Sequence, residues 1–204
     1  LVFDDGIKRL ARVINVEARQ LELVEELADN VELPVQVTIA SGFPKGDKLE
    51  FITQKVTELG ASQIWAFPAD WSVAKWDGKK LGKKVEKLEK IALGAAEQSK
   101  RNLVPSITLF EKKADFVAQF DQFDRIVVAY EESAKEGESA ALIQAVADLE
   151  KGAKLLFIFG PEGGLSPAEI ESFEAKGAVL AGLGPRILRA ETAPLYALSA
   201  LSVL

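Results

Sequence analysis

From Val35 onward the chain alternates short apolar runs with longer amphipathic segments, and this alternation constrains the fold more than any other feature. After the first apolar run, Asp47 and Glu50 indicate the start of a helix that ends at Gly60. Such alternation is typical of an α/β fold with a parallel sheet covered on both faces. We expect strands at residues 35–40, 63–67, 106–110, 125–130, 154–159 and 178–181, and further helices near 79–100, 113–121, 139–150, 167–176 and 193–204. The last helix is apolar nearly all round, which predicts burial in the core or against another subunit.

Residues 1–33 have a different pattern. Asp4-Asp5-Gly6 is a hairpin signal, and residues 7–16 and 20–27 alternate imperfectly between apolar and polar positions, as half-buried antiparallel strands do. We interpret this segment as the remnant of a small β-domain that ends near Leu33. The chain starts without methionine, inside what resembles a strand, and we therefore expect it to be a fragment of a longer protein.

The composition excludes several classes of protein. The 204 residues suffice for one domain, or one domain with a small appendage, and a hydrophobic content of 48% allows a sizeable core. No apolar run approaches the roughly 20 residues of a membrane helix, which predicts a soluble, cytoplasmic protein. With no histidine and no cysteine, the chain lacks the groups on which Ser-His-Asp hydrolases, papain-like proteases and zinc hydrolases depend, and we expect no metal.

The expected helix from Lys79 to Arg101 is strongly basic. Residues 75–101 carry nine Lys/Arg and four Asp/Glu, a local charge of +5 in a protein of net charge −6. A solvated helix is one interpretation of these lysines, but a basic island on an acidic protein favours contact with a polyanion such as nucleic acid. The residues that we predict to contact nucleic acid are Lys79, Lys80, Lys83, Lys84, Lys87, Lys100 and Arg101.

A glycine-rich loop, Gly160-Pro-Glu-Gly-Gly164, follows the apolar run 154–159. A buried strand that ends in such a turn delivers the loop to a ligand at the carboxyl end of a sheet. The loop matches neither nucleotide-binding glycine motif and contains Glu162, so a phosphate site is disfavoured. Ser166 and Glu169 form a capping box that fixes the loop to the start of a helix. A plain strand-to-helix turn would explain only one or two of the glycines.

A second polar loop, Leu183-Gly-Pro-Arg-Ile-Leu-Arg-Ala-Glu-Thr-Ala193, comes about twenty residues later. Thr192 is a candidate cap for the last helix. Arg189 and Glu191 either form a structural ion pair or face a ligand, and the two loops together predict one pocket.

These two loops closely resemble the paired signatures of the RsmE family, bacterial 16S ribosomal RNA (uracil-N3) methyltransferases of the SPOUT superfamily. Three shorter stretches agree with it: Pro44–Gly60, Ser72-Val73 and Ala95–Arg101. The resemblance therefore spans about residues 35–204. One departure is Ala69-Asp-Trp71, where the family is expected to place an acidic residue and an arginine.

The resemblance implies a SPOUT-type parallel sheet with a deep C-terminal trefoil knot, formed by roughly residues 125–204. It divides the chain into residues 1–33, part of a PUA-like RNA-binding β-barrel, and residues 34–204, the methyltransferase domain. It further implies a homodimer that binds S-adenosylmethionine (SAM) in the knot and acts on 16S ribosomal RNA of the small ribosomal subunit.

The same resemblance assigns roles to individual residues. The cofactor would be held by Phe159, Gly160, Pro161, Glu162, Gly163, Gly164, Leu183, Gly184, Ile187, Leu188, Arg189, Glu191, Thr192 and Ala193. Methylation at N3 requires loss of the N3 proton. Arg101 is our candidate for contacting the uracil or its phosphate, Arg189 is a second cation, and Glu162 either accepts the proton or only orients the cofactor. Two alternatives stay open: an RNA-binding protein of this fold without activity, and a SPOUT enzyme that methylates another RNA position.

Overall fold

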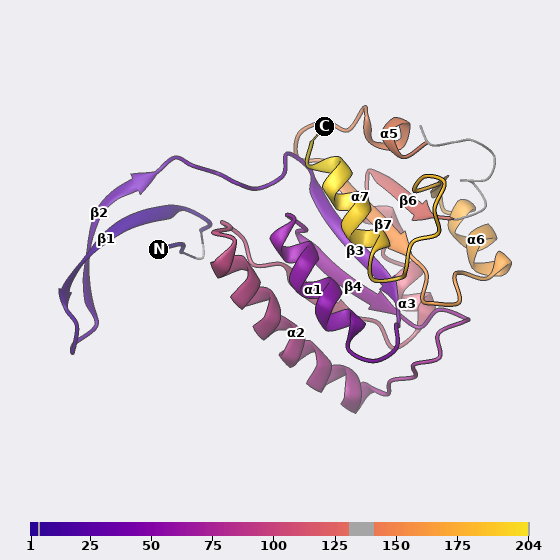
Figure 1. Ribbon diagram of the computed structural model, residues 1–204, viewed down its shortest axis with the longest axis horizontal. Helices are drawn as coiled ribbons and strands as arrows, with labels where there is room; N and C mark the ends of the chain where they lie inside the picture. The colour runs from indigo at the N-terminus through magenta and orange to yellow at the C-terminus, as the bar shows by residue number, and fades with distance from the viewer. Residues whose placement is uncertain (4, 131–140, 204) are drawn as a thin grey trace.

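A hairpin stands apart from the main body in the computed structural model, which describes residues 1–3, 5–130 and 141–203 (Figure 1). Strands β1 (Lys8–Asn15) and β2 (Gln20–Leu27) pair antiparallel, as expected. Most of their side chains are exposed, so the prediction that these strands are half-buried is wrong. The side-chain amide of Asn102 donates to the Gly6 carbonyl oxygen at 2.9 Å and connects this segment to the body. The predicted β-hairpin is confirmed, whereas its membership in a barrel stays a prediction.

The main body is built on a six-stranded sheet in the order β5-β4-β3-β7-β6-β8, and every neighbouring pair is parallel. The strands are β3 (Gln36–Gly42), β4 (Gln63–Phe67), β5 (Ser106–Leu109), β6 (Arg125–Ala129), β7 (Lys154–Phe159) and β8 (Val179–Ala181). Their positions agree with the apolar runs of the sequence, so the parallel α/β fold is confirmed. The loops after β7 and β8 both leave from the carboxyl edge of this sheet.

Helices cover both faces of the sheet, in positions close to those expected. They are α1 (Lys48–Glu58), α2 (Gly78–Gln98), α3 (Lys113–Val117), α5 (Ala141–Val146), α6 (Pro167–Glu174) and α7 (Ala193–Leu201). The helix predicted for residues 113–121 is divided into α3 and a 3-10 turn, Phe120–Gln122, because hydrogen bonds three residues apart tighten the chain there. The helix expected at 139–150 ends earlier, at Val146, and its first two residues lie outside the described part.

Alternating side chains of β7 divide the core into two layers. Leu155, Phe157 and Phe159 pack with α1, α5 and α7 on one face, whereas Leu156 and Ile158 pack with α3 and α6 on the other. The long helix α2 packs outside α1 and against β5. The central strand is therefore buried on both faces, and its carboxyl end is held firmly in place.

The helix ends show which capping signals were informative. The Ser166–Glu169 capping box is present, with proline at the start of α6. Asp47 and Thr192 stand at the N-cap positions of α1 and α7, but their side chains make no capping hydrogen bond, so the prediction of these two caps is wrong. In both residues the backbone is not in the extended conformation that directs a capping side chain at the helix.

Helix α7 is buried on one face only. Ala197, Leu198 and Leu201 pack into the core, whereas Tyr196 is 43% exposed. Burial of that second face against another subunit stays a prediction. In the part of the chain that the structure describes, every helix is too short or too polar to cross a membrane.

Candidate active site at the carboxyl edge of the sheet

The glycine-rich loop after β7 is folded so tightly that side chains would not fit. A Cβ atom on Gly160 would lie 2.7 Å from the carbonyl carbon of Gly164, and one on Gly42, at the end of β3, would lie 2.5 Å from Cδ of Pro161. Gly164 also has a φ of +79°, which favours glycine. Three glycines are thus required by close approach or by φ, and they fix the loop in a tight turn.

Lys48 joins the two loops that the sequence placed in one pocket. From the first turn of α1, its Nζ lies 3.0 Å from Oε1 of Glu162 in the first loop and 3.0 Å from Oε2 of Glu191 in the second. The backbone N–H of Lys45 also donates to Glu162, at 3.1 Å. The two loops are therefore brought together, by a lysine that the sequence reasoning did not select. That they form one pocket stays a prediction.

The charges of this trio are mutually stabilised. Partial burial alone would raise the pKa of Glu162, but hydrogen bonds from Lys48 and from backbone N–H groups hold this pKa below its usual range. Partial burial alone would also raise the pKa of Glu191, but a backbone hydrogen bond, Lys48 and the charge of Arg189 hold this pKa below its usual range. The hydrogen bonds from Lys48 to the two carboxylates, Glu162 first, raise the pKa of Lys48. A carboxylate with a lowered pKa is a weaker base, so Glu162 is better suited to positioning than to accepting a proton.

A hollow of about 100 Å³ lies beside the second loop. It is lined by Ala129, Tyr130, Leu183, Gly184, Arg186, Ile187, Leu188 and Ala193, from β6, the second loop and α7. Gly184 has a φ of +91°, and a Cβ there would lie 3.8 Å from the hydroxyl of Tyr196. Ligand pockets are typically roughly 300–1,000 Å³, so a molecule bound here would extend beyond the hollow.

Arg189 does not form the structural ion pair that the sequence left open, because Glu191 pairs with Lys48 instead. Its backbone carbonyl accepts the N–H groups of Thr192 and Ala193, at 2.9 and 3.0 Å, which fixes its place at the start of α7. Its side chain is exposed, and within the described ranges no carboxylate lies within ion-pair distance of it. The guanidinium is therefore exposed beside the second loop, although its charge also acts on Glu191.

A second ionic cluster fixes the start of α6, and the sequence indicated only its capping box. Glu169, which is 1% exposed, accepts the backbone N–H of Asp70 at 3.0 Å and the ammonium of Lys113 at 3.2 Å. The hydroxyl of Ser166 donates to Asp70 at 2.6 Å, and Lys113 also contacts Asp70. These contacts connect the loop after β4, the start of α3 and the glycine-rich loop.

The structure does not bring Arg101 to this pocket. Its side chain is 3% exposed and lies at the amino edge of the sheet, where it contacts Glu32. It also donates to the carbonyl oxygens of Thr57 and Ala61, at 3.0 and 2.6 Å. Because the guanidinium is buried and bonded, we replace the predicted contact with uracil by a structural role.

The predicted RNA-binding lysines divide into three groups. Lys79, Lys80 and Lys83 are exposed in the first turns of α2, at the carboxyl edge. Lys84 and Lys87 contact Glu50 of α1, at 3.5 and 3.1 Å. Lys100 is exposed but lies beyond the other end of α2, roughly 30 Å away for 21 helical residues. Only the first group is both unpaired among the described residues and on the carboxyl side of the sheet.

Comparison with known proteins agrees with this geometry. Residues 31–202 match the family model described as an RNA methyltransferase domain. The chain belongs to this RNA methyltransferase family. It is 54% identical over 180 residues to the ribosomal RNA small subunit methyltransferase E of Bacillus subtilis, an alignment that covers 88% of this chain and 70% of that protein.

Other members of the family are more distant but extend over the whole chain. The ribosomal RNA small subunit methyltransferase E of Mycobacterium bovis is 31% identical over 214 residues, covering 100% of this chain and 78% of that protein. The crystal structure of a ribosomal RNA small subunit methyltransferase E from Neisseria gonorrhoeae, bound to S-adenosyl methionine, has a TM-score of 0.73. It is 26% identical and covers 97% of this chain and 79% of that chain. The family resemblance recognised in the sequence is thus confirmed.

Proposed function

We propose that this protein transfers a methyl group from SAM to N3 of a uridine in 16S ribosomal RNA of the small ribosomal subunit. The observation that carries the proposal is the pair of loops at the carboxyl edge, joined by Lys48 to Glu162 and Glu191 beside a hollow. The 54% identity to the Bacillus subtilis methyltransferase supports the same reaction and the same RNA.

The residues at this edge fit SAM. The glycine-rich loop is held in a tight turn by close contacts between its own backbone atoms. The hollow beside the second loop would take one part of the ligand, and the rest would lie along the loops. We assign cofactor contact to the residues predicted from the sequence, which are residues 159–164, 183, 184, 187–189 and 191–193. When bound, SAM supplies an electrophilic methyl group on a sulfonium, so the protein needs chiefly to align the acceptor.

Arg189 is the residue that we assign to the uracil. Removal of the N3 proton leaves negative charge on the base, and a guanidinium beside the pocket stabilises that charge. The anchored backbone and exposed side chain of Arg189 suit this role. Glu162 holds the loop through Lys48 and Lys45. We therefore propose that water accepts the N3 proton.

Further assignments follow the family resemblance. We propose that the C-terminal segment forms the trefoil knot, that residues 1–33 belong to a PUA-like β-barrel, and that the protein works in the cytoplasm. We also propose a homodimer, which the exposed Tyr196 on α7 and Phe51 on α1 support, because these two helices pack side by side.

Two measurements test the proposed function. Calorimetry should detect SAM binding to the wild-type protein and a loss of at least tenfold in affinity for Gly160→Ala, where the new Cβ would displace the loop. Gly82→Ala is the matched control, because a Cβ at this helical position meets nothing within 4 Å. Ribosomal RNA from a deletion strain should gain one methyl group, mapped by mass spectrometry to N3 of a uridine. Binding of RNA without uptake of SAM would favour a protein of this fold without activity.

A further inference from the structure

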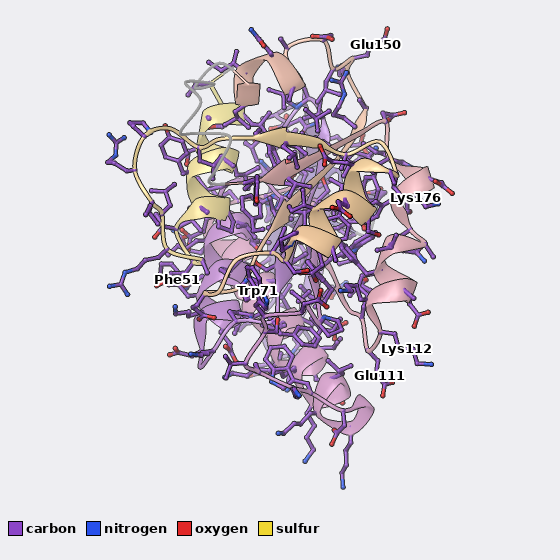
Figure 2. All side chains as sticks on the ribbon, turned by 90° about the vertical axis from the view of Figure 1, so that its right-hand side faces the viewer. Phe51, Trp71, Glu111, Lys112, Glu150 and Lys176 are labelled. Atoms are coloured by element: carbon purple, nitrogen blue, oxygen red, sulfur yellow. The ribbon has the colours of Figure 1, made fainter. Side chains whose placement is uncertain are left out.

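Trp71 lies exposed against the glycine-rich loop, on the side that faces the viewer in Figure 2. A Cβ on Gly163 would lie 3.1 Å from Cβ of Trp71, and one on Gly164 would lie 4.0 Å from Cζ3 of its ring. The indole therefore runs along the backbone of two glycines, and 49% of the residue remains exposed. One side of the ring is supported by the loop, and much of the rest is open to solvent.

The backbone around Trp71 is fixed. Asp70 is held at its N–H by Glu169 and at its carboxylate by Ser166 and Lys113. On the other side, the N–H of Ser72 donates to the Ala69 carbonyl at 2.9 Å. An aromatic side chain on such a support loses little conformational entropy when it binds a ligand.

The other two tryptophans already have partners. Trp65 is 4% exposed and packs edge-on against Phe110 and Phe123. Trp76 packs against Phe43, with ring centroids 4.3 Å apart, and carries the ammonium of Lys84 4.3 Å from its ring centroid. Among the described residues, Trp71 has no such ring or cation partner.

Trp71 also lies between two parts of the proposed site. Its loop follows β4 and leads into the first turns of α2, which carry the exposed Lys79, Lys80 and Lys83. On the other side of Trp71 lies the glycine-rich loop, which follows β7. The hollow lies at the end of β6, the strand next to β7 in the sheet. A nucleic acid strand held by the lysines would pass Trp71 before it reaches the hollow.

We infer that Trp71 is a stacking platform for an unpaired base of the RNA substrate. The inference rests on the proposed function and adds a positioning residue to it. N3 of uridine belongs to the Watson–Crick edge, so the target nucleotide has to be unpaired or extruded. An exposed, supported indole offers the π-face on which such bases stack.

The test compares Trp71→Ala with Trp71→Phe, which keeps an aromatic face, and with Val73→Ala, an exposed side chain of the same loop. Methylation kinetics on unmethylated small-subunit ribosomal RNA give KM and kcat, and calorimetry gives the SAM affinity. Trp71→Ala should raise KM for RNA about 5- to 150-fold, the range of base–aromatic stacking. Its affinity for SAM should stay within about twofold of wild type. Trp71→Phe should recover most of the loss, and Val73→Ala should behave as wild type.

Tryptophan fluorescence gives a direct readout of stacking. RNA should quench the emission of the wild-type protein, and Trp71→Phe should lose most of that quenching. An unchanged KM for RNA in Trp71→Ala, an equal loss in Trp71→Phe, or a loss of SAM affinity instead would each overturn the inference. If the wild-type protein does not methylate, the proposed function fails, whereas quenching by the same RNA still decides whether Trp71 stacks.

Discussion

Lys48 and Arg101 are both cations bound by glutamates from distant segments, but they lie at opposite edges of the sheet. Arg101 is nearly fully buried and its donors are taken by Glu32 and by main-chain carbonyls. Lys48 keeps 27% of its side chain exposed, and within the described residues its ion pairs are those with the two carboxylates of the loops. A cation whose hydrogen bonds are complete stabilises the fold, whereas one that bridges two half-exposed loops can also respond to a ligand.

The largest effect is expected at the buried cation. Arg101→Ala leaves Glu32 without its cation, and removing one partner of a buried pair costs about 3–5 kcal/mol. Urea unfolding should show this loss, and the free energy of unfolding of Arg101→Lys should lie between those of the wild type and Arg101→Ala. The folded fraction of Arg101→Ala should bind SAM normally at low temperature. If Arg101→Ala were as stable as the wild type but did not methylate RNA, Arg101 would have a role in the reaction, and the contrast with Lys48 would be wrong.

The exposed lysines come next, because they have no structural task. Replacing Lys79, Lys80 and Lys83 by alanine should weaken RNA binding about tenfold or more at low salt. Each lost phosphate contact should reduce the slope of log affinity against log salt by roughly 0.7–0.9. Changing Lys151, Lys154 and Lys176, which are also exposed, removes equal charge elsewhere and is the matched control. Equal losses in both triple variants would show that net charge alone is responsible.

Lys48→Ala tests the cation that joins the two loops at the carboxyl edge. Partly exposed ion pairs contribute about 0–1 kcal/mol, so the free energy of unfolding should hardly change. Affinity for SAM should nevertheless fall several-fold, because Glu162 and Glu191 would then repel each other and separate the loops. Lys55→Ala, which breaks a pair with Glu58 on the same helix, should leave SAM binding unchanged in calorimetry. A large loss of stability in Lys48→Ala would remove the distinction between the two cations.

The smallest effect is the pH dependence of stability. The pKa values of Glu162 and Glu191 are lowered from an ordinary value of 4.5, so their stabilising contribution is complete above that pH. It is lost as the pH falls through the lowered pKa values. Urea midpoints of the wild-type protein should therefore drop more steeply below pH 4.5 than those of Glu162→Gln. Parallel curves for the two proteins would contradict this.

The sequence predicted the sheet and the two loops well, because both depend on local signals. Apolar runs and glycines indicate where a strand ends, and the loop from Gly160 to Gly164 is where they placed it. Arg101 was assigned to the wrong environment because helical periodicity gives the face of α2 but not the elements that its far end meets. Lys48 was missed because its partners lie more than a hundred residues away.

The cluster of Asp70, Ser166 and Glu169 connects the loop that we assign to RNA with the loop that we assign to SAM. The loop that carries Trp71 is bonded to the helix start that follows the glycine-rich loop. Because the two loops are bonded to each other, a ligand that favours one position of the first loop also favours one position of the second. RNA and SAM should therefore strengthen each other's binding, and by thermodynamic reciprocity the factor is the same in both directions.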